Sequence, residues 1–419
     1  MNFLSVLTSL GPTVVLPIII TLVGLIFRQG FGKAIRSGIT IGIGFAGINM
    51  VFGFFWGTIA PVAESLVKNA GFKLNVIDMG WPATSSVAWG SSLAPAIALG
   101  IIMVNFIMLM FRWTKTLNVD IWNYWGSMLL GQIAFHRTGS AFIGILTGVV
   151  VMIPTLVLAD KTQKIMYDYF QIPGVSIPHL FTQSAGLIAF PVNWLLDRIP
   201  GINKINLDPE NIQKKMGIVG EPMILGLVIG AVLALIARLP YQQVLTTGMG
   251  LAASMVLLPR MVSILMEGMV PVSEAASEFM TKKFEGREIY IGMDSAIMLG
   301  DPVNLTTAVL LIPIAILLAV VLPGNKVLPL VDLPSIVYMT VVAVGLTKGN
   351  LFRSVLIGIP MLCATLWTAT AMAPYVTVLA REVGFDIPAG TTAISSLSTG
   401  YYWFPYLIQE VITKISSIF

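Results

Sequence analysis

The side chains with the greatest chemical potential in this sequence are carboxylates and amides placed among apolar residues. Asp301 lies in the segment Leu299-Gly300-Asp301-Pro302-Val303-Asn304, seven residues after Asp294 and directly before the apolar run 305–322. Carboxylate and amide groups on a broken stretch of backbone can form paired hydrogen bonds with neighbouring hydroxyls, and Asp301 could accept the proton of a reacting hydroxyl. Asp and Asn also commonly begin helices, so a helix cap at Asp301 is an equal alternative. The pattern predicts a hydroxyl-binding site containing Asp294, Asp301 and Asn304.

A second group of polar residues surrounds His179, in the segment Ile177-Pro178-His179-Leu180-Phe181-Thr182-Gln183-Ser184. An imidazole and an amide offer both donors and acceptors to hydroxyl groups, so we expect His179 and Gln183 to contact the same ligand. The alternative is a histidine whose hydrogen bonds are satisfied by backbone carbonyls.

Four further residues are candidates for the lining of this site. Trp89 could stack against the C–H groups of a polyol or belong to an interfacial aromatic belt, and Ser91 follows it in a Gly-Ser-Ser segment. Asn49 could bond a neighbouring helix or face a cavity. Glu221 could cap the N-terminus of a helix, where negative charge is favourable, or face the site.

The composition places these groups in a membrane protein. Of the 419 residues, 56% are hydrophobic and 11% charged, and the mean hydropathy is +0.88; soluble domains have about 25% charged residues. With no phosphate-binding loop, no Gly-x-Ser-x-Gly motif, two histidines and one cysteine, we expect no metal site, no cofactor and no phosphorylation site on this chain. The net charge of +4 indicates no nucleic-acid surface. Because polar groups are costly inside a bilayer, those named above are the functional candidates.

The apolar runs predict an all-α integral membrane protein with about 11 transmembrane helices, since each span needs about 20 apolar residues. The predicted spans are 11–27, 37–59, 95–111, 121–136, 139–159, 217–237, 241–266, 305–322, 326–347, 354–379 and 398–413. Four other apolar segments are rich in Gly, Pro and small polar residues, which predicts re-entrant hairpins that line a cavity. These segments are Trp81–Ala94, Pro173–Phe190, Met293–Asn304 and Ile387–Thr399.

The sequence also contains an internal repeat. An ordered set of residues returns 210 positions later, with Pro12, Arg28, Gly38 and Pro61-Val62-x-Glu64 matched by Pro222, Arg238, Gly248 and Pro271-Val272-x-Glu274. Further along, the register settles near 214, which puts Ala393 opposite His179. We therefore predict a first repeat in 1–196, a cytoplasmic connector in 197–215 and a second repeat in 216–419.

The distribution of basic residues predicts that the two repeats are inverted. With the N-terminus outside, 17 Lys and Arg fall on the cytoplasmic side and 6 on the outside, in agreement with the positive-inside rule. This orientation requires an odd number of crossings in each repeat. Inverted repeats with broken helices are typical of transporters whose site lies where the repeats meet.

Several strings in the sequence resemble one transporter family. They are Ile172-Pro173-Gly174-Val175-Ser176-Ile177-Pro178, Asn193-Trp194-Leu195-Leu196-Asp197-Arg198-Ile199-Pro200 and Gly220-Glu221-Pro222-Met223-Ile224. They are similar to the galactitol-type membrane component, enzyme IIC, of the bacterial sugar phosphotransferase system. The resemblance implies a homodimer in the bacterial cytoplasmic membrane, with a static scaffold and a mobile core that carries the sugar in an elevator-like movement. It also implies a separate IIB partner that donates phosphate from a cysteine and is itself supplied by IIA.

The resulting expectation is a multi-pass IIC subunit that moves a polyol, galactitol first among the candidates, for phosphorylation by IIB. Its site would contain His179, Gln183, Asp294, Asp301 and Asn304, with Trp89 and Ser91 completing the pocket. The alternative is an ion-coupled secondary transporter or facilitator in which Asp294, Asp301 or Glu221 handles a proton or sodium, since broken helices and inverted repeats serve that class equally well.

Overall fold

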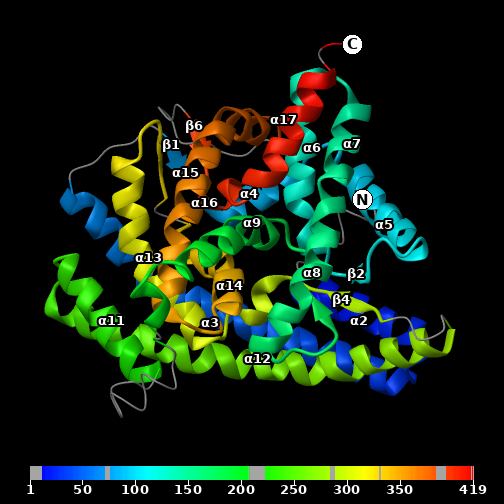
Figure 1. The fold of residues 1–419 in the computed structure, drawn as a ribbon, viewed down its shortest axis with the longest axis horizontal. Coiled ribbons are helices and arrows are strands. Elements are labelled where there is room, and N and C mark those ends of the chain that lie inside the picture. The colour runs from blue at the N-terminus through cyan, green and yellow to red at the C-terminus, as the bar shows by residue number, and fades with distance from the viewer. Residues whose placement is uncertain are drawn as a thin grey trace.

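The structure is a computed structural model that describes residues 12–70, 76–205, 207, 222–283, 288–329, 332–383, 393–416 and 418. As expected for a membrane protein of this composition, 77% of it is helical, and several of its apolar helices could span a membrane. Figure 1 shows two regions, a layer of long helices along the lower edge and a body of shorter helices above it.

The lower region, called the long-helix layer below, consists of four helices. They are α2 (Pro12–Ile26), α3 (Phe31–Ala70), α11 (Pro222–Ile236) and α12 (Tyr241–Lys283). The helices α3 and α12 pack along much of their length, while α2 packs on α3 and α11 packs on α12. Glycines allow the close approach, because a Cβ atom on Gly250 of α12 would lie 2.7 Å from the side chain of Thr58 on α3. At 40 and 43 residues, α3 and α12 are far longer than a perpendicular span requires.

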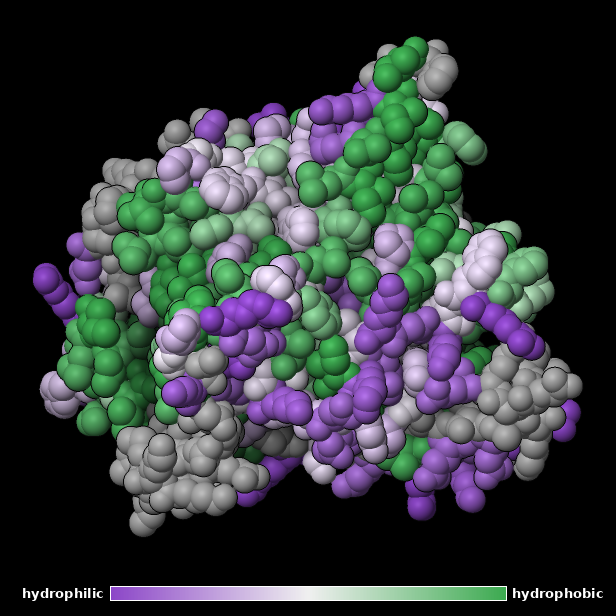
Figure 2. Space-filling view, viewed as in Figure 1, coloured by the Kyte–Doolittle hydropathy of each residue, from purple (hydrophilic) through white to green (hydrophobic). Residues whose placement is uncertain are grey.

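The body is built from the remaining helices. They are α4 (Gly80–Trp89), α5 (Ala94–Met110), α6 (Trp125–Thr138), α7 (Ala141–Val150), α8 (Met152–Phe170), α9 (Leu180–Leu196), α13 (Pro302–Val321), α14 (Ile336–Leu346), α15 (Leu351–Glu382), α16 (Leu397–Gly400) and α17 (Trp403–Ser416). Short 3-10 helices lie between them at η1 (Ile121–Tyr124), η2 (Ile202–Lys204), η4 (Ser295–Met298) and η5 (Leu333–Ser335). Figure 2 shows apolar side chains over α17 at the top and hydrophilic side chains gathered over the lower part, around α8 and α12.

Six short strands, which the sequence analysis did not predict, form two parallel three-stranded sheets in the body. The strands are β1 (Val76–Asp78), β2 (Thr116–Asn118), β3 (Val175–Ser176), β4 (Tyr290–Gly292), β5 (Val327–Leu328) and β6 (Ala393–Ser395). Their orders are β5-β1-β6 and β2-β4-β3. The central strand of each sheet therefore comes from one half of the chain and both of its neighbours come from the other half, which ties the halves together through backbone hydrogen bonds.

Among the residues that the structure describes, three helices are long and apolar enough to cross a membrane: Ala141–Phe170, Pro302–Val321 and Leu351–Glu382. A fourth candidate is the pair Ala83–Trp89 and Ala94–Met110, which is bent by 84° at its break. That break falls in the first of the predicted broken segments. The total of about 11 spans stays a prediction.

The prediction of one continuous span over 326–347 was wrong. The segment begins with β5 and η5, and the helix α14 starts only at Ile336. Pro329 and Pro334 lack the backbone N–H that a helix interior needs. The side chain of Asn325 also donates to the carbonyls of Ala319 and Val327, at 2.7 and 2.8 Å, and so closes the end of α13 just before this segment.

Gly400 is expected to be one of the positions most sensitive to an added methyl group. A Cβ atom there would lie 1.9 Å from the carbonyl oxygen of Thr365 on α15, which is backbone and cannot rotate away. We expect Gly400→Ala to destabilise the protein by about 3 kcal/mol or more, measured as a lower thermal unfolding midpoint in detergent. Gly53→Ala is the control, because nothing lies within 4 Å of its added Cβ; an unchanged midpoint in Gly400→Ala would contradict the packing described here.

Candidate functional site

The three strands of the β2-β4-β3 sheet bring three polar residues to one edge. The strands are parallel, with Asn118 paired to Gly292 and Ser176 also paired to Gly292, so their carboxyl ends meet. Asp120 follows β2, Asp294 follows β4 and His179 follows β3. The sequence analysis placed His179 and Asp294 in one site without predicting a contact between them, and strand pairing brings them together.

His179 and Asp294 face each other across a short gap. The Nε2 atom of His179 lies 3.6 Å from Oδ2 of Asp294, which is longer than a hydrogen bond. An oxygen atom placed beside this gap can lie within hydrogen-bonding distance of both atoms. The side chain of His179 is only 2% exposed, whereas that of Asp294 is 14% exposed, so Asp294 is the more accessible member of the pair.

The remaining contacts of His179 fix the orientation of its ring. Its Nδ1 atom lies 3.2 Å from Oγ1 of Thr182 and 3.1 Å from Oγ of Ser295. The ring packs against Phe181, with centroids 3.6 Å apart, and its edge approaches Tyr338. With Nδ1 occupied by hydroxyls of the protein, Nε2 is the ring nitrogen that points to Asp294.

Asp120 supports Asp294 from the neighbouring strand end, although the sequence analysis did not select it. Its Oδ2 accepts from the backbone N–H of Asp294 at 3.1 Å, and its Oδ1 accepts from the N–H of Trp122 at 3.0 Å. Asp294 in turn accepts from the N–H of Ala296 at 2.7 Å through Oδ1. A signal was present in the sequence, because Val119-Asp120-Ile121 is matched by Val331-Asp332-Leu333 in the second half.

The opposite end of this sheet lies at a charged surface. Lys115 and Glu288, just before β2 and β4, form an ion pair of 2.9 Å between side chains that are each more than half exposed. Their hydrogen bond raises the pKa of Lys115 and lowers the pKa of Glu288. The sheet therefore runs from a solvated ion pair inward to the edge that carries His179 and Asp294.

Trp89 lies near the same edge through its contact with Trp122. The two indole rings meet edge to face with centroids 6.3 Å apart. Both indole N–H groups are buried, and neither has a hydrogen-bond acceptor among the described residues. Ser91 is buried and donates to the carbonyl of Ala88 at 2.7 Å, which holds the break after α4. Unsatisfied buried donors are uncommon, which sets these two indoles apart from most polar groups that the structure describes.

Asp301 begins α13 as its N-cap residue. Its Oδ1 accepts from the backbone N–H of Asn304 at 2.8 Å, so the capping role that the sequence left open is present. Its Oδ2 also accepts from the hydroxyl of Tyr169 at 3.1 Å. The structure thus gives both carboxylate oxygens a protein partner without excluding a second role.

Asn304 and Gln183 are buried and bonded within the protein. Asn304 donates to the carbonyl of Val337 at 3.0 Å and accepts from Thr340 at 2.7 Å, which joins α13 to α14. Gln183 donates to Thr162 at 2.9 Å and to the carbonyl of Ile177 at 2.7 Å. Both amides therefore hold the elements around the site.

The two other predicted candidates receive no structural test. Glu221 lies outside the described residues, and so does the side chain of Asn49, although its backbone belongs to α3. Among the described residues, no three His, Cys, Asp or Glu side chains gather as metal ligands.

The other sheet has a comparable polar edge, formed by Asp78 and Asp332. Asp78 accepts from the N–H groups of Gly80 and Asp332, and Asp332 accepts from those of Trp81 and Ser398. Both carboxylates are buried and bonded to backbone donors. This edge joins broken segments from both halves of the chain.

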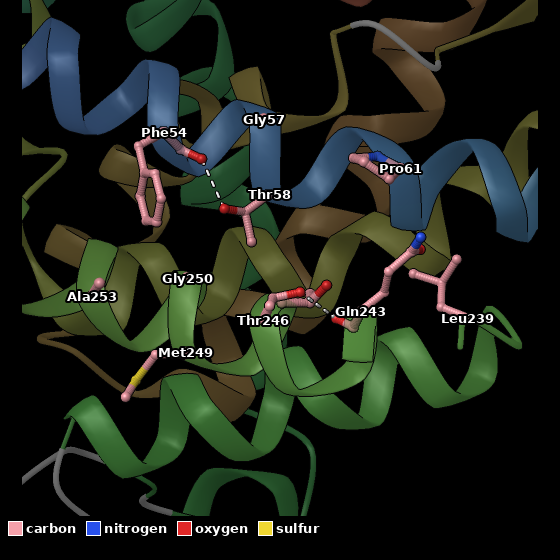
Figure 3. A pocket seen from close by; sticks show the side chains of 11 residues that line it. Phe54, Gly57, Thr58, Pro61, Leu239, Gln243, Thr246, Met249, Gly250 and Ala253 are labelled. Atoms are coloured by element: carbon pink, nitrogen blue, oxygen red, sulfur yellow. Dashed lines mark hydrogen bonds between the residues drawn. The ribbon is translucent and has the colours of Figure 1, made fainter. Parts of the chain in front are cut away.

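The described grooves lie in the long-helix layer and not at His179. Figure 3 shows one of them, of about 670 Å³, between α3 and α12 and lined by residues such as Phe54, Thr58, Leu239 and Gln243. Since the part of its lining that the structure describes carries no charged side chain, the polar residues at the β2-β4-β3 edge are the better candidate for chemistry.

Comparisons with known proteins identify the family of this chain. Residues 5–390 match the family of PTS system sugar-specific permease components. The galactitol-specific EIIC component from Escherichia coli (strain K12) is 37% identical over 377 residues, which cover 90% of this chain and 83% of the relative, and that of Escherichia coli O157:H7 matches equally. A further protein of Escherichia coli (strain K12), described only as a permease IIC component, is 37% identical over 97% of this chain and 92% of its own length. The chain therefore belongs to the sugar-specific permease (IIC) components of the bacterial phosphotransferase system, which are proteins of the inner membrane.

Proposed function

We propose that this permease component binds and translocates a polyol, galactitol first among the candidates, while a separate IIB protein phosphorylates it. The galactitol-specific relatives support this substrate class, although a relative without a named substrate is equally similar. The observation that carries the proposal is the pair of His179 and Asp294, held at a strand edge with Nε2 and Oδ2 directed at each other.

The chemistry of this pair suits a neutral ligand with neighbouring hydroxyl groups. A carboxylate accepts hydrogen bonds and an imidazole can donate one, so a single hydroxyl beside the gap can donate to Asp294 and accept from His179. The indole N–H groups of Trp89 and Trp122 add donors near the same edge. Hydrogen bonds to a charged carboxylate are stronger than those between neutral groups, so Asp294 would contribute most to affinity.

Phosphorylation by IIB would require a proton acceptor. The substrate oxygen forms a bond to phosphorus, the cysteine sulfur of IIB leaves as a thiolate, and the hydroxyl proton passes to a base. Asp294 is the first candidate for this base, because its side chain is partly exposed whereas that of His179 beside it is buried. Asp301, the base that the sequence suggested, remains the second candidate.

The variant Asp301→Asn separates the helix-capping role of Asp301 from its possible role as the base. Asparagine caps helices as well as aspartate does, and its carbonyl oxygen can keep the bond from the N–H of Asn304. We expect the unfolding midpoint to change little and, if Asp301 is the base, uptake with IIB to fall by about 100-fold or more. Wild-type uptake by this variant would remove Asp301 from the site and leave Asp294 as the acceptor.

We also propose that the chain consists of two inverted repeats. The order of elements from α2 to β3 has a counterpart from α11 to β6, and Arg28 and Arg238 both adopt a left-handed conformation after their first helix. In this correspondence the strand pairings would align Val175 with Ile394, and Ser398 rather than Ala393 would then stand opposite His179.

The long-helix layer would be the static scaffold of an elevator-like transporter, and the body, which holds both sheets, would be its mobile core. The transporter would act as a homodimer. Inverted repeats with broken segments at the site support alternating access by this kind of movement.

The test is uptake of labelled galactitol by vesicles, with and without a phosphorylated IIB partner, followed by identification of the product inside. Galactitol phosphate formed only with IIB is expected. Free galactitol that accumulates with an ion gradient and is lost with an uncoupler would instead establish the ion-coupled alternative, which family membership disfavours.

A further inference from the structure

A groove at one end of the long-helix layer has charged walls and an apolar floor. It has a volume of about 640 Å³ and lies between the turn from α2 to α3 and the C-terminal part of α12. Its polar lining residues are Arg28, Gln29, Lys33, Glu274 and Glu278. No residue of the candidate sugar site belongs to its lining.

The two charge signs come from different elements. Arg28 and Lys33 belong to the α2–α3 turn and the start of α3, whereas Glu274 and Glu278 lie one turn apart on the same face of α12. The turn is held by hydrogen bonds from the N–H of Arg28 to Leu25 and from the N–H of Gln29 to Gly24. The groove therefore presents cations on one wall and carboxylates on the other.

The floor of the groove is aromatic, and exposed apolar side chains flank it in the chain. The rings of Phe27 and Phe279 are 5.7 Å apart, and the Arg28 guanidinium lies 5.9 Å from the centre of Phe279. Ile26 and Phe31, which stand on either side of the lining residues of the turn, are large, apolar and exposed. In a membrane protein such side chains face acyl chains.

We propose that this groove binds the headgroup of a zwitterionic phospholipid with a primary ammonium, which is phosphatidylethanolamine. The phosphate would lie against Arg28 and Lys33, and the ammonium would donate to Glu274 and Glu278. The acyl chains would lie against the exposed side chains of Ile26 and Phe31. Basic residues near the membrane surface attract lipid phosphate, and two carboxylates select a headgroup that carries hydrogen-bond donors.

The groove in Figure 3 supplies an internal comparison. It lies beside the turn from α11 to α12, and its described lining includes Pro61, Leu239 and Gln243 but no charged residue. Arg238 in that turn is exposed and has the same left-handed backbone as Arg28. An exposed arginine after a helix is thus shared by both turns, whereas among the described side chains the pair of carboxylates borders the groove at Arg28.

The test is native mass spectrometry of the purified protein with equal amounts of phosphatidylethanolamine, phosphatidylcholine and phosphatidylglycerol, all with palmitoyl and oleoyl chains. Choline has no N–H to donate, and the glycerol headgroup has no ammonium. We expect retention of phosphatidylethanolamine to exceed that of either competitor by about fivefold. The double variant Glu274→Gln/Glu278→Gln should remove this preference, and Arg28→Gln/Lys33→Gln should weaken binding of all three lipids.

The control variant is Arg238→Gln, which should leave the preference unchanged. Equal retention of the three lipids by the wild-type protein would overturn the proposal, and so would a preference that survives in Glu274→Gln/Glu278→Gln. Equally tight binding of glycerophosphoethanolamine, which has no acyl chains, would overturn the assignment to a lipid. The four side chains are exposed, so these variants should fold, and a single size-exclusion peak checks that they do.

Discussion

Asp294→Asn is expected to weaken galactitol binding by about 10-fold to 100-fold while leaving the fold intact. The asparagine carbonyl can still accept from the N–H of Ala296, so the start of η4 keeps its cap. The substitution removes the charge that faces Nε2 of His179 and that would accept from a substrate hydroxyl. A hydrogen bond to a charged group contributes about 1.5–3 kcal/mol, which corresponds to the expected loss of affinity.

The measurement is the Kd of labelled galactitol for purified protein without IIB, so that binding is separated from phosphorylation. Asp168→Asn is the matched control, because that carboxylate is exposed and paired with Lys164 on the surface of α8. His179→Gln should also raise the Kd, because it removes the imidazole whose Nε2 would donate to a substrate hydroxyl. An unchanged Kd in both Asp294→Asn and His179→Gln would move the polyol site elsewhere.

Part of this site could be predicted from the sequence, because a histidine and a carboxylate in broken apolar segments are costly there. That argument selected His179 and Asp294 for one site but could not predict that they face each other, since their strands lie more than 100 residues apart. Asp120 was missed because the strands themselves were not predicted: β2, β3 and β4 have only two or three residues each and show no alternating pattern. The pairing between halves that assembles the edge is non-local.

The amides illustrate a second limit of sequence reasoning. Asn304 and Gln183 are polar residues in apolar segments, and that pattern is the same whether the partner is a substrate or another part of the protein. The structure gives them protein partners, at Val337 and Thr340 for Asn304 and at Thr162 for Gln183. Burial of a polar group thus indicates that it has a partner and does not identify it.

The helices were easier to predict than the breaks between them. Long apolar runs indicated α2, α5 and α13 to within a few residues, because an apolar helix satisfies its own backbone. The run 326–347 is also largely apolar, yet its first part pairs as β5 with β1 from the other half of the chain. Hydropathy alone does not distinguish a helix from a strand that is buried on both faces.

Asp332→Ala is expected to destabilise the protein by about 2–6 kcal/mol. The carboxylate accepts from the N–H of Trp81 at 3.1 Å and from the N–H of Ser398 at 2.7 Å, and it is fully buried. Alanine would leave both donors without an acceptor, and each unsatisfied buried group costs about 1–3 kcal/mol. Because Trp81 follows β1 and Ser398 follows β6, the loss would separate broken segments from the two halves of the chain. The measurement is the thermal unfolding midpoint in detergent.

Asp332→Asn distinguishes this explanation from a general intolerance of substitution. Its single carbonyl oxygen can satisfy one of the two N–H groups, so the destabilisation should be about half that of Asp332→Ala. The N–H of residue 332 would still donate to Asp78 in both variants, because that bond involves only backbone atoms of residue 332. Equal destabilisation in the two variants would mean that the charge of Asp332, and not its two acceptor oxygens, holds the segments together.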